Sequence, residues 1–447
     1  MQQDALELGE LLGDEVIQRQ ESGYDLDGAL PVVREALAAG RTGWAPELGY
    51  AYDALEETRV RPDWPYAEPS GLDQILATLG ADVELQPPGG EALADRVYAA
   101  WLGRCVGCNL GKPVEGDGWD RQKVRRYLEL ADAYPITDYL PVLDPAPDGL
   151  VLDESWQVTT RGRVNGMARD DDTDYTILGL HLLEEYGFGF TTAQVGGLWL
   201  LRMPFEQTYT AERVAYRNLV RGIVPPHTAT YRNPYREWIG AQIRADIFGY
   251  ACPGQPRRAA TLAYRDAALS HTGNGIYGEM WAAALIAASF AVSTAREALD
   301  IATTVVPPAT RLAEVLRLVS TAFDAGLSWD EAIGQVERRF NGYHWIHTVN
   351  NAGILAAALL WGEGDFGRTI GLAVEAGADT DSDAATAGSV FGALHGTAAL
   401  PAHWVGPLHD TIRSAVTGFD NARISDLARR TVALAGRAEA VSNSRGQ

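Results

Sequence analysis

Two clusters of aspartates are the residues in this sequence whose types and spacing most clearly suggest chemistry. Residues 170–174 (Asp-Asp-Asp-Thr-Asp) place four carboxylates in five positions, and residues 379–383 (Asp-Thr-Asp-Ser-Asp) place three. Each cluster comes just before a stretch with helical periodicity, at 175–183 and 384–394. One or two aspartates at a helix start are explained by capping of free N–H groups. These clusters exceed that need, and like charges so close repel unless a cation offsets them.

A divalent cation is the natural counter-charge for such clusters. Mg²⁺ and Mn²⁺ prefer carboxylate and hydroxyl oxygens, and both clusters offer serine or threonine hydroxyls beside the carboxylates. Neither cluster has the long loop and closing glutamate of an EF-hand. The sequence therefore favours a metal role for the pair of clusters over capping or solvated charge alone.

A third segment, residues 103–115 (Gly-Arg-Cys-Val-Gly-Cys-Asn-Leu-Gly-Lys-Pro-Val-Glu), completes a pattern with the two clusters. In this order the three segments resemble the ADP-ribosylglycohydrolase family, which includes dinitrogenase-reductase-activating glycohydrolase. That family carries Gly-x-x-x-Gly-Asp-x-x-Gly with a nearby Glu, then Thr-Asp-Asp-Thr, then Gly-Asp-Thr-Asp-Thr before a helix of small residues. The similarity extends over about residues 91–396, which is most of the chain.

The resemblance implies an all-α, orthogonal multi-helix bundle that holds two divalent metal ions, Mg²⁺ or Mn²⁺. It implies cleavage of an N- or O-glycosidic bond in an ADP-ribosyl or related ribosyl substrate. For catalysis we expect Glu115 to act as a base or to move near the metals, with Asp172 or Asp381 sharing that role. Carried over by motif position, the metal ligands are Glu115, Asp170, Asp171, Asp172, Asp379, Asp381 and Ser382.

Three of the departures from the family pattern change a polar or reactive side chain. Cys108 replaces an Asp, Asp170 replaces the Thr that opens the second motif, and Ser382 replaces a Thr but keeps the hydroxyl. These departures leave open a non-catalytic module that binds an ADP-ribose-like ligand, although retention of Glu115 and both Asp pairs favours an enzyme. A dimetal hydrolase of phosphate esters is a third interpretation, disfavoured because the clusters lack a basic phosphate clamp.

Substrate contacts are expected from segments that combine glycine, asparagine or aromatic residues. Residues 271–279 (His-Thr-Gly-Asn-Gly-Ile-Tyr-Gly-Glu) lead into a helix, where glycines let the backbone approach a ligand and free N–H groups can hold an anion. Residues 233–238 and 344–351 carry Tyr, Trp, His and Asn, although capping and aromatic packing explain them equally well. The predicted substrate-binding residues are Asn274, Gly275, Glu279, His347 and Asn350.

Cysteine content favours a structural role for the three thiols. Cys105 and Cys108 form a Cys-x-x-Cys pair, but no second Cys pair or suitable His pair accompanies them, so zinc or redox chemistry is disfavoured. A sparse, odd number of cysteines fits a reducing compartment. The N-terminus lacks the basic and apolar regions of a signal peptide, and the apolar stretch at 280–292 is too short to span a bilayer. We expect a cytoplasmic protein.

Helical periodicity dominates the sequence after a break at Pro87-Pro88-Gly89-Gly90. This predicts an N-terminal helical appendage over residues 1–88 and a catalytic domain over 89–447. A local extended piece is suggested only at 151–160. The expected helices are 92–103, 173–186, 192–201, 211–220, 238–250, 257–269, 276–290, 311–325, 330–340, 350–361, 365–376 and 384–394.

The formal net charge of −22 bears on possible partners. An acidic surface repels phosphate backbones, so nucleic-acid binding is disfavoured, and no membrane partner is expected. We expect a small-molecule or ADP-ribosylated substrate. The sequence does not predict the oligomeric state.

Overall fold

The computed structural model describes residues 8–38, 46–116 and 118–445. Over these residues the fold is all-α, as predicted. The only sheet among them pairs β1 (Thr411–Ile412) with β2 (Ala422–Arg423) in antiparallel register.

The helices fall into an N-terminal group and a main body. The N-terminal group is α1 (Leu8–Glu21), α2 (Leu30–Ala38), α3 (Pro46–Glu56) and α4 (Leu72–Leu76). The first half of the body is α5 (Gly90–Gly111), η1 (Lys112–Val114), α6 (Arg121–Leu130), α7 (Trp156–Thr159), α8 (Asp171–Tyr186), η2 (Gly187–Gly189), α9 (Thr192–Arg202), η3 (Phe205–Gln207), α10 (Thr210–Val220), α11 (His227–Thr230), η4 (Gln242–Arg244) and α12 (Asp246–Ala251). The second half is α13 (Pro256–Ala267), α14 (Gly273–Ser289), α15 (Ala295–Thr303), α16 (Arg311–Asp324), α17 (Trp329–Arg339), α18 (Thr348–Trp361), α19 (Phe366–Glu375), α20 (Thr380–His395), η5 (Thr397–Ala399), α21 (Ala402–Val405), η6 (Gly406–Leu408) and α22 (Ile424–Arg445).

Two sequence expectations about secondary structure were wrong. The helix predicted over 238–250 is largely irregular, and only η4 and the short α12 form there, because its apolar residues reach the core from turns as well as from a helix. The extended piece suggested at 151–160 is a turn followed by the single-turn helix α7. Conversely, α15 had not been expected, although Thr294 and Glu297 form a capping box at its start.

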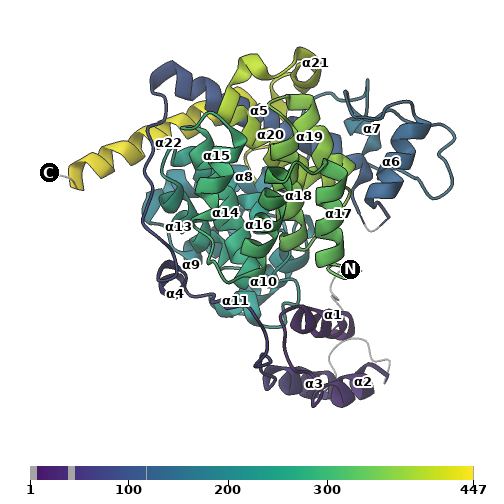
Figure 1. Cartoon of the computed structure of the whole chain (residues 1–447). Helices are drawn as coiled ribbons and strands as arrows, with labels where there is room; N and C mark the ends of the chain where they lie inside the picture. The colour runs from purple at the N-terminus through teal and green to yellow at the C-terminus, as the bar shows by residue number, and fades with distance from the viewer. Residues whose placement is uncertain (1–7, 39–45, 117, 446–447) are drawn as a thin grey trace.

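Helix α14 is the centre of the main body. Every residue of α14 is buried, which explains its run of alanines and apolar residues, since a helix that is apolar all round must be enclosed. It packs against α12, α13, α15 and α20, and it lies in the middle of the body in Figure 1.

Helices α5 and α20 cross with their backbones in close contact. Cβ atoms placed on Gly103 and Gly388 would lie 2.0 and 2.1 Å from the carbonyl oxygen of the other glycine. Gly107 makes a similar approach to the Ala384 carbonyl oxygen, where a Cβ would lie at 1.9 Å. Only glycine permits such contacts. The C-terminal end of α5 is therefore held against the N-terminal end of α20, and both carry predicted site residues.

Helices α1, α2 and α3 of the N-terminal group pack on one end of the body, below α10 and α11 in Figure 1. Their apolar core, which includes Leu11 and Leu55, continues into Val214 of α10. Arg236 of the body pairs with Glu15 of α1 at 2.6 Å. The chain then runs along the body, where the Leu85 N–H donates to the Gly254 carbonyl at 2.8 Å.

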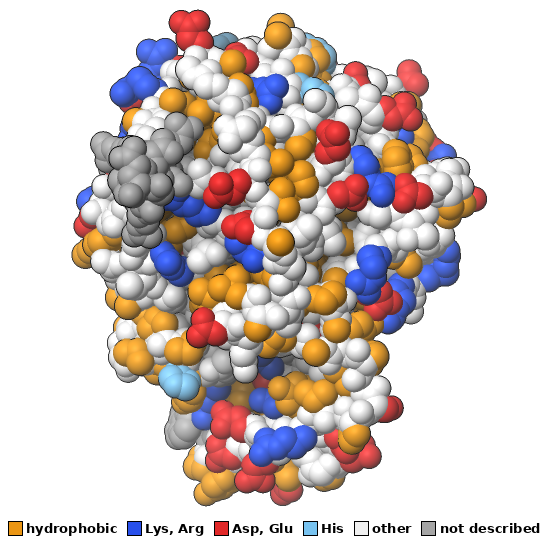
Figure 2. All heavy atoms as spheres, turned by 60° about the vertical axis from the view of Figure 1, so that its left-hand side comes forward, with side chains coloured by type: hydrophobic (Ala, Val, Ile, Leu, Met, Phe, Trp, Pro, Cys, Tyr) orange, Lys and Arg blue, Asp and Glu red, His pale blue; other side chains and the backbone are white. Residues whose placement is uncertain are grey.

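The surface mixes charge signs. On the face shown in Figure 2, acidic and basic side chains are interspersed with apolar ones. Among the described residues, we find no helix with both the length and the apolar character needed to cross a bilayer.

Candidate metal centre and active site

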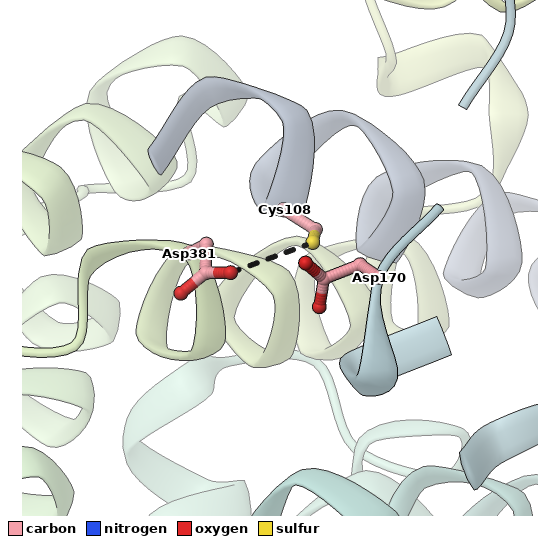
Figure 3. A group of neighbouring side chains, drawn as sticks. All are labelled: Cys108, Asp170 and Asp381. Carbon is pink, nitrogen blue, oxygen red and sulfur yellow. Dashed lines mark hydrogen bonds between the residues drawn. The ribbon is translucent and has the colours of Figure 1, made fainter. Parts of the chain in front are cut away.

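The two aspartate clusters, far apart in sequence, meet at one place. Ligand atoms of Cys108, Asp170 and Asp381 all lie within 4.8 Å of one another. Figure 3 shows Cys108 on α5, Asp381 on α20 and Asp170 on the segment that leads into α8, with their side chains converging. The Cys108 thiol lies 3.9 Å from Asp381 Oδ2. The expectation that both clusters share one site is confirmed.

Two further carboxylate groups adjoin this triad. Oxygens of Glu115, Asp379 and Asp381 lie within 4.8 Å of one another, and so do oxygens of Asp170, Asp171 and Asp172. The Ser382 hydroxyl donates to Asp172 Oδ2 at 3.0 Å. The structure thus brings together all the predicted metal ligands, with Asp381 and Asp170 each shared by two groups.

Helix N-termini position these carboxylates. Asp170 is the N-cap of α8, and its Oδ1 accepts the Asp172 N–H at 2.9 Å. The sequence analysis placed both clusters just before their helices. In the structure α8 begins at Asp171 and α20 at Thr380, so most of the acidic residues belong to the first helical turns. The positive end of the helix dipole favours this placement.

Two cations from α5 and η1 contact the first cluster, and the sequence analysis missed both. Buried Arg104 donates from Nη2 to the Asp172 carbonyl at 2.7 Å and to Asp172 Oδ1 at 3.2 Å. Lys112 Nζ forms an ion pair with Asp170 Oδ2. Both residues lie inside the Gly103–Glu115 motif, so their proximity to Glu115 in sequence was the available signal.

The electrostatics of the site leave carboxylates in need of positive charge. Burial and the nearby Asp381 raise the pKa of both Glu115 and Asp172 well above their usual range. Burial, together with Asp170, raises the pKa of Asp381 to about 6. Asp170 differs: burial acts to raise its pKa, but Lys112, the Asp172 N–H and Arg169 together lower the pKa below its usual range.

The donor set fits a hard divalent cation. Apart from the Cys108 thiol, the groups offer carboxylate oxygens and the adjoining Ser382 hydroxyl, which are ligands of Mg²⁺ and Mn²⁺. Asp379 is buried, and its Oδ1 accepts no hydrogen bond from any described residue. A buried oxygen without a donor is costly, and a bound cation would satisfy it. Glu115, Asp379 and Asp381 are the residues that best fit such an ion.

A cavity of about 800 Å³ opens beside the carboxylates. Its wall includes Glu115, Asp171, Asp172, Asp379, Asp381 and Ser382. Other parts of the wall are aromatic or apolar, with Tyr209, Trp238, Trp345 and Ile346. The wall thus combines carboxylates on one part with aromatic faces on another, and aromatic faces can stack on flat groups.

The five predicted substrate-binding residues do not line this cavity. Asn274 donates to Glu237 Oε1 and accepts from the Leu312 N–H, so its polar atoms are used in packing. A Cβ on Gly275 would lie 2.5 Å from the Arg236 carbonyl oxygen, which explains this glycine without a ligand. Both residues belong to the enclosed helix α14, which cannot face the cavity.

The other three have similar structural roles. Glu279 is fully buried in α14, 3.7 Å from Arg244. His347 caps α18 by accepting the Val349 N–H at 3.1 Å, and Asn350 donates to the His344 carbonyl at 3.2 Å. The two aromatic segments singled out in the sequence do reach the cavity, but through Trp238, Trp345 and Ile346.

Glu212 of α10 is a further cavity residue that sequence reasoning missed. Its side chain is buried at the cavity wall and pairs with Arg244, which also pairs with Asp266. Burial, opposed by Arg244, raises the pKa of Glu212 to about 7. The available signal was a glutamate in a helix whose neighbours Ala211, Val214 and Ala215 are core residues.

The fold and the site together define an all-α protein with clustered carboxylates that could hold a metal ion, beside a cavity. A family model of ADP-ribosylglycohydrolases matches residues 90–441, the whole body from α5 into α22. The chain belongs to the ADP-ribosylglycohydrolase family.

Comparisons with individual proteins add little to this assignment. The chain is similar to a solved structure described as an ADP-ribosylglycohydrolase-related protein complex, at 19% sequence identity and a TM-score of 0.46. The alignment covers 77% of this chain and 99% of that one. A search of curated proteins found no match.

Proposed function

We propose that the protein is a metal-dependent glycoside hydrolase that cleaves an N- or O-glycosidic bond of an ADP-ribosyl or related ribosyl substrate. The substrate is a small molecule or an ADP-ribosylated protein, and the metal is Mg²⁺ or Mn²⁺. The observation that carries the proposal is the convergence of Glu115, Asp171, Asp172, Asp379 and Asp381 on the wall of one cavity. Membership of the glycohydrolase family supports the reaction class.

The carboxylates have distinct roles in this proposal. When bound at these carboxylates, divalent ions would supply positive charge that orients sugar hydroxyls and favours loss of a proton from the attacking water. Glu115 lines the cavity, and burial raises its pKa, so it can take a proton from the attacking water. Glycosidic cleavage passes through an oxocarbenium-like state, which the negative charge of Asp172 and Asp381 stabilises.

The aromatic wall serves the remainder of the substrate. Trp238 stacks on His344 with ring centroids 4.3 Å apart and an interplanar angle of 9°, which holds the indole in place. A fixed indole beside Trp345 offers a surface on which a base or another flat group can stack. The carboxylate end would then receive the ribose.

The decisive experiment measures product release in the presence of Mn²⁺ or Mg²⁺. Substrates would be an ADP-ribosylated protein, an ADP-ribosyl small molecule, simple N- and O-glycosides, and a phosphate monoester as comparison. Release of ADP-ribose or a sugar that is abolished by EDTA supports the proposal. Binding of ADP-ribose without turnover of any glycoside would favour the non-catalytic binding module, and phosphate release alone would favour a phosphoesterase.

A further inference from the structure

Lysine is rare in this chain, and one lysine lies at the metal centre. The sequence has 37 lysine and arginine residues, but only Lys112 and Lys123 are lysines. Lys123 is on the exposed part of α6, where its Nζ donates to the Gly118 carbonyl at 2.6 Å. Lys112 instead lies on the cavity wall, with 19% of its side chain exposed. An ammonium is a compact point charge, closer to a metal ion in shape than a planar guanidinium is.

Lys112 pairs with the carboxylate that two of the three possible metal-binding groups share. Asp170 belongs to the group with Cys108 and Asp381 and to the group with Asp171 and Asp172. Both of its oxygens already have donors, since Oδ1 accepts the Asp172 N–H and Oδ2 pairs with Lys112. Side-chain exposure of Asp170 is 1%, so little room remains around it for hydrated ions.

No hydrogen bond or ion pair among the described residues joins Lys112 to the third group. Glu115, Asp379 and Asp381 form it without Asp170, and Asp379 Oδ1 has no donor among the described residues. The Asp170 and Asp379 positions differ in whether a positive charge already lies beside the carboxylate. The Asp170 position already has a positive charge, whereas the Asp379 position still needs one.

We propose that the Lys112 ammonium replaces one of the two divalent ions that the family resemblance implies. The chain then holds a single divalent ion, at Glu115, Asp379 and Asp381, with Lys112 as a fixed cation at Asp170. This inference rests on the metal dependence in the proposed function and refines its stoichiometry. It also gives Asp170, which replaces a threonine of the family pattern, a partner in Lys112.

The test is metal stoichiometry in the full-length protein. Mn²⁺ binding is measured by equilibrium dialysis and by isothermal titration for the unmodified protein, Lys112→Met and Lys123→Met. Methionine keeps the length of lysine without its charge, and Lys123→Met makes the same change away from the site. We expect one Mn²⁺ for the unmodified protein and for Lys123→Met, and two for Lys112→Met. Electron paramagnetic resonance should show an isolated Mn²⁺ in the first two and a spin-coupled pair in the third.

Three results would overturn the inference. Two Mn²⁺ ions in the unmodified protein would show that Lys112 yields its place to a metal, whether or not the variants fold. One ion in a folded Lys112→Met would show that the lysine does not exclude the second ion, and Lys112→Gln provides the same comparison if Lys112→Met is unstable. If the protein binds no Mn²⁺ at all, the metal dependence of the proposed function fails as well. If it binds two ions, only the present inference fails, so the two failures are distinguishable.

Discussion

Individual carboxylates in the site differ in how well their neighbours satisfy them. Asp172 accepts hydrogen bonds from Arg104 and Ser382, and Asp170 forms an ion pair with Lys112. Asp379 lacks a donor at Oδ1, and its neighbours Asp381 and Glu115 are also acidic. Burial and these neighbours raise the pKa of Asp379 well above its usual range. Asp379 is therefore the carboxylate whose contribution should depend most on a bound cation.

Asp379→Asn should weaken Mn²⁺ binding by at least about tenfold, since an amide keeps the shape but removes the charge that a hard cation requires. The same change should leave the metal-free protein as stable as before or more stable, because one buried like charge is lost. Titration calorimetry and thermal unfolding in EDTA measure the two effects. Unchanged Mn²⁺ affinity would remove Asp379 from the proposed metal ligands.

Glu115→Gln should separate binding from chemistry. We expect the variant to keep bound Mn²⁺ through Asp379 and Asp381 but to slow turnover by about 10²-fold or more, because glutamine cannot accept a proton. The measurement is kcat on the glycosidic substrate at saturating Mn²⁺. A variant with full kcat would exclude Glu115 as the base.

Cys108→Ser is the control for thiol chemistry at the same site. Burial, with the nearby Asp170, raises the pKa of Cys108 well above its usual range, so the group is a neutral thiol beside Asp381. A serine hydroxyl is also neutral, so we expect the kcat of Cys108→Ser to stay within about threefold of that of the unmodified protein. An inactive Cys108→Ser together with an active Glu115→Gln would overturn the proposed mechanism.

At the scale of elements, the crossing of α5 and α20 sets the distance between the first motif and the second aspartate cluster. The crossing brings Glu115, just after η1, within reach of Asp381 in the first turn of α20. A change in side-chain conformation cannot relieve a clash at this crossing, because the close contacts are to backbone atoms. The glycines of the first motif, which resemble a family signature, thus act through packing.

Gly103→Ala should therefore damage both stability and metal binding. The new Cβ would meet the Gly388 carbonyl oxygen at 2.0 Å, and separation of the helices should cost about 3 kcal/mol or more in unfolding free energy. Gly197→Ala in α9 is the matched control, because a Cβ there meets nothing within 4 Å, and alanine should be neutral or slightly stabilising. Urea unfolding of both variants measures the difference. Equal stability would mean that the crossing tolerates a side chain.

At the scale of the whole molecule, buried acids should make the metal-free protein sensitive to pH. Unfolded Asp and Glu lose their protons near pH 4, whereas folded Asp381 and Glu212 keep theirs up to pKa values of about 6 and about 7. Between about pH 4 and pH 7 the folded state thus binds more protons than the unfolded state. Linkage then requires that stability contributed by these groups falls as pH rises through this window.

We expect the Tm in EDTA to be lower at pH 7.5 than at pH 5 by on the order of 5 °C. Added Mn²⁺ or Mg²⁺ should recover much of this loss at pH 7.5, because a ligand that binds only the native state stabilises it, and carboxylates bind cations when ionised. Differential scanning calorimetry over pH 5–8, with and without metal, checks both parts. A metal-free Tm that rises across this range, or a Tm indifferent to metal at pH 7.5, would contradict the assignment.

Local sequence was enough to predict the helical class, most helix positions and the two aspartate clusters that the fold brings together. Helical periodicity repeats over short distances, and the clusters at 170–174 and 379–383 carry more charge than helix capping requires. The family motifs add their order along the chain. These features depend on neighbours in sequence, so they can be recognised without coordinates.

Tertiary structure decided which residues face the cavity and which cations reach the carboxylates. Asn274 and His347 have the residue types of ligand contacts, yet α14 is enclosed on all sides and His347 caps α18. Lys112 and Arg104 contact residues more than fifty positions away, and Glu212 reaches the cavity only because α10 packs beside it. Long-range contacts of this kind follow from how helices cross, and a crossing such as Gly103 on Gly388 joins segments whose sequences give no sign of each other.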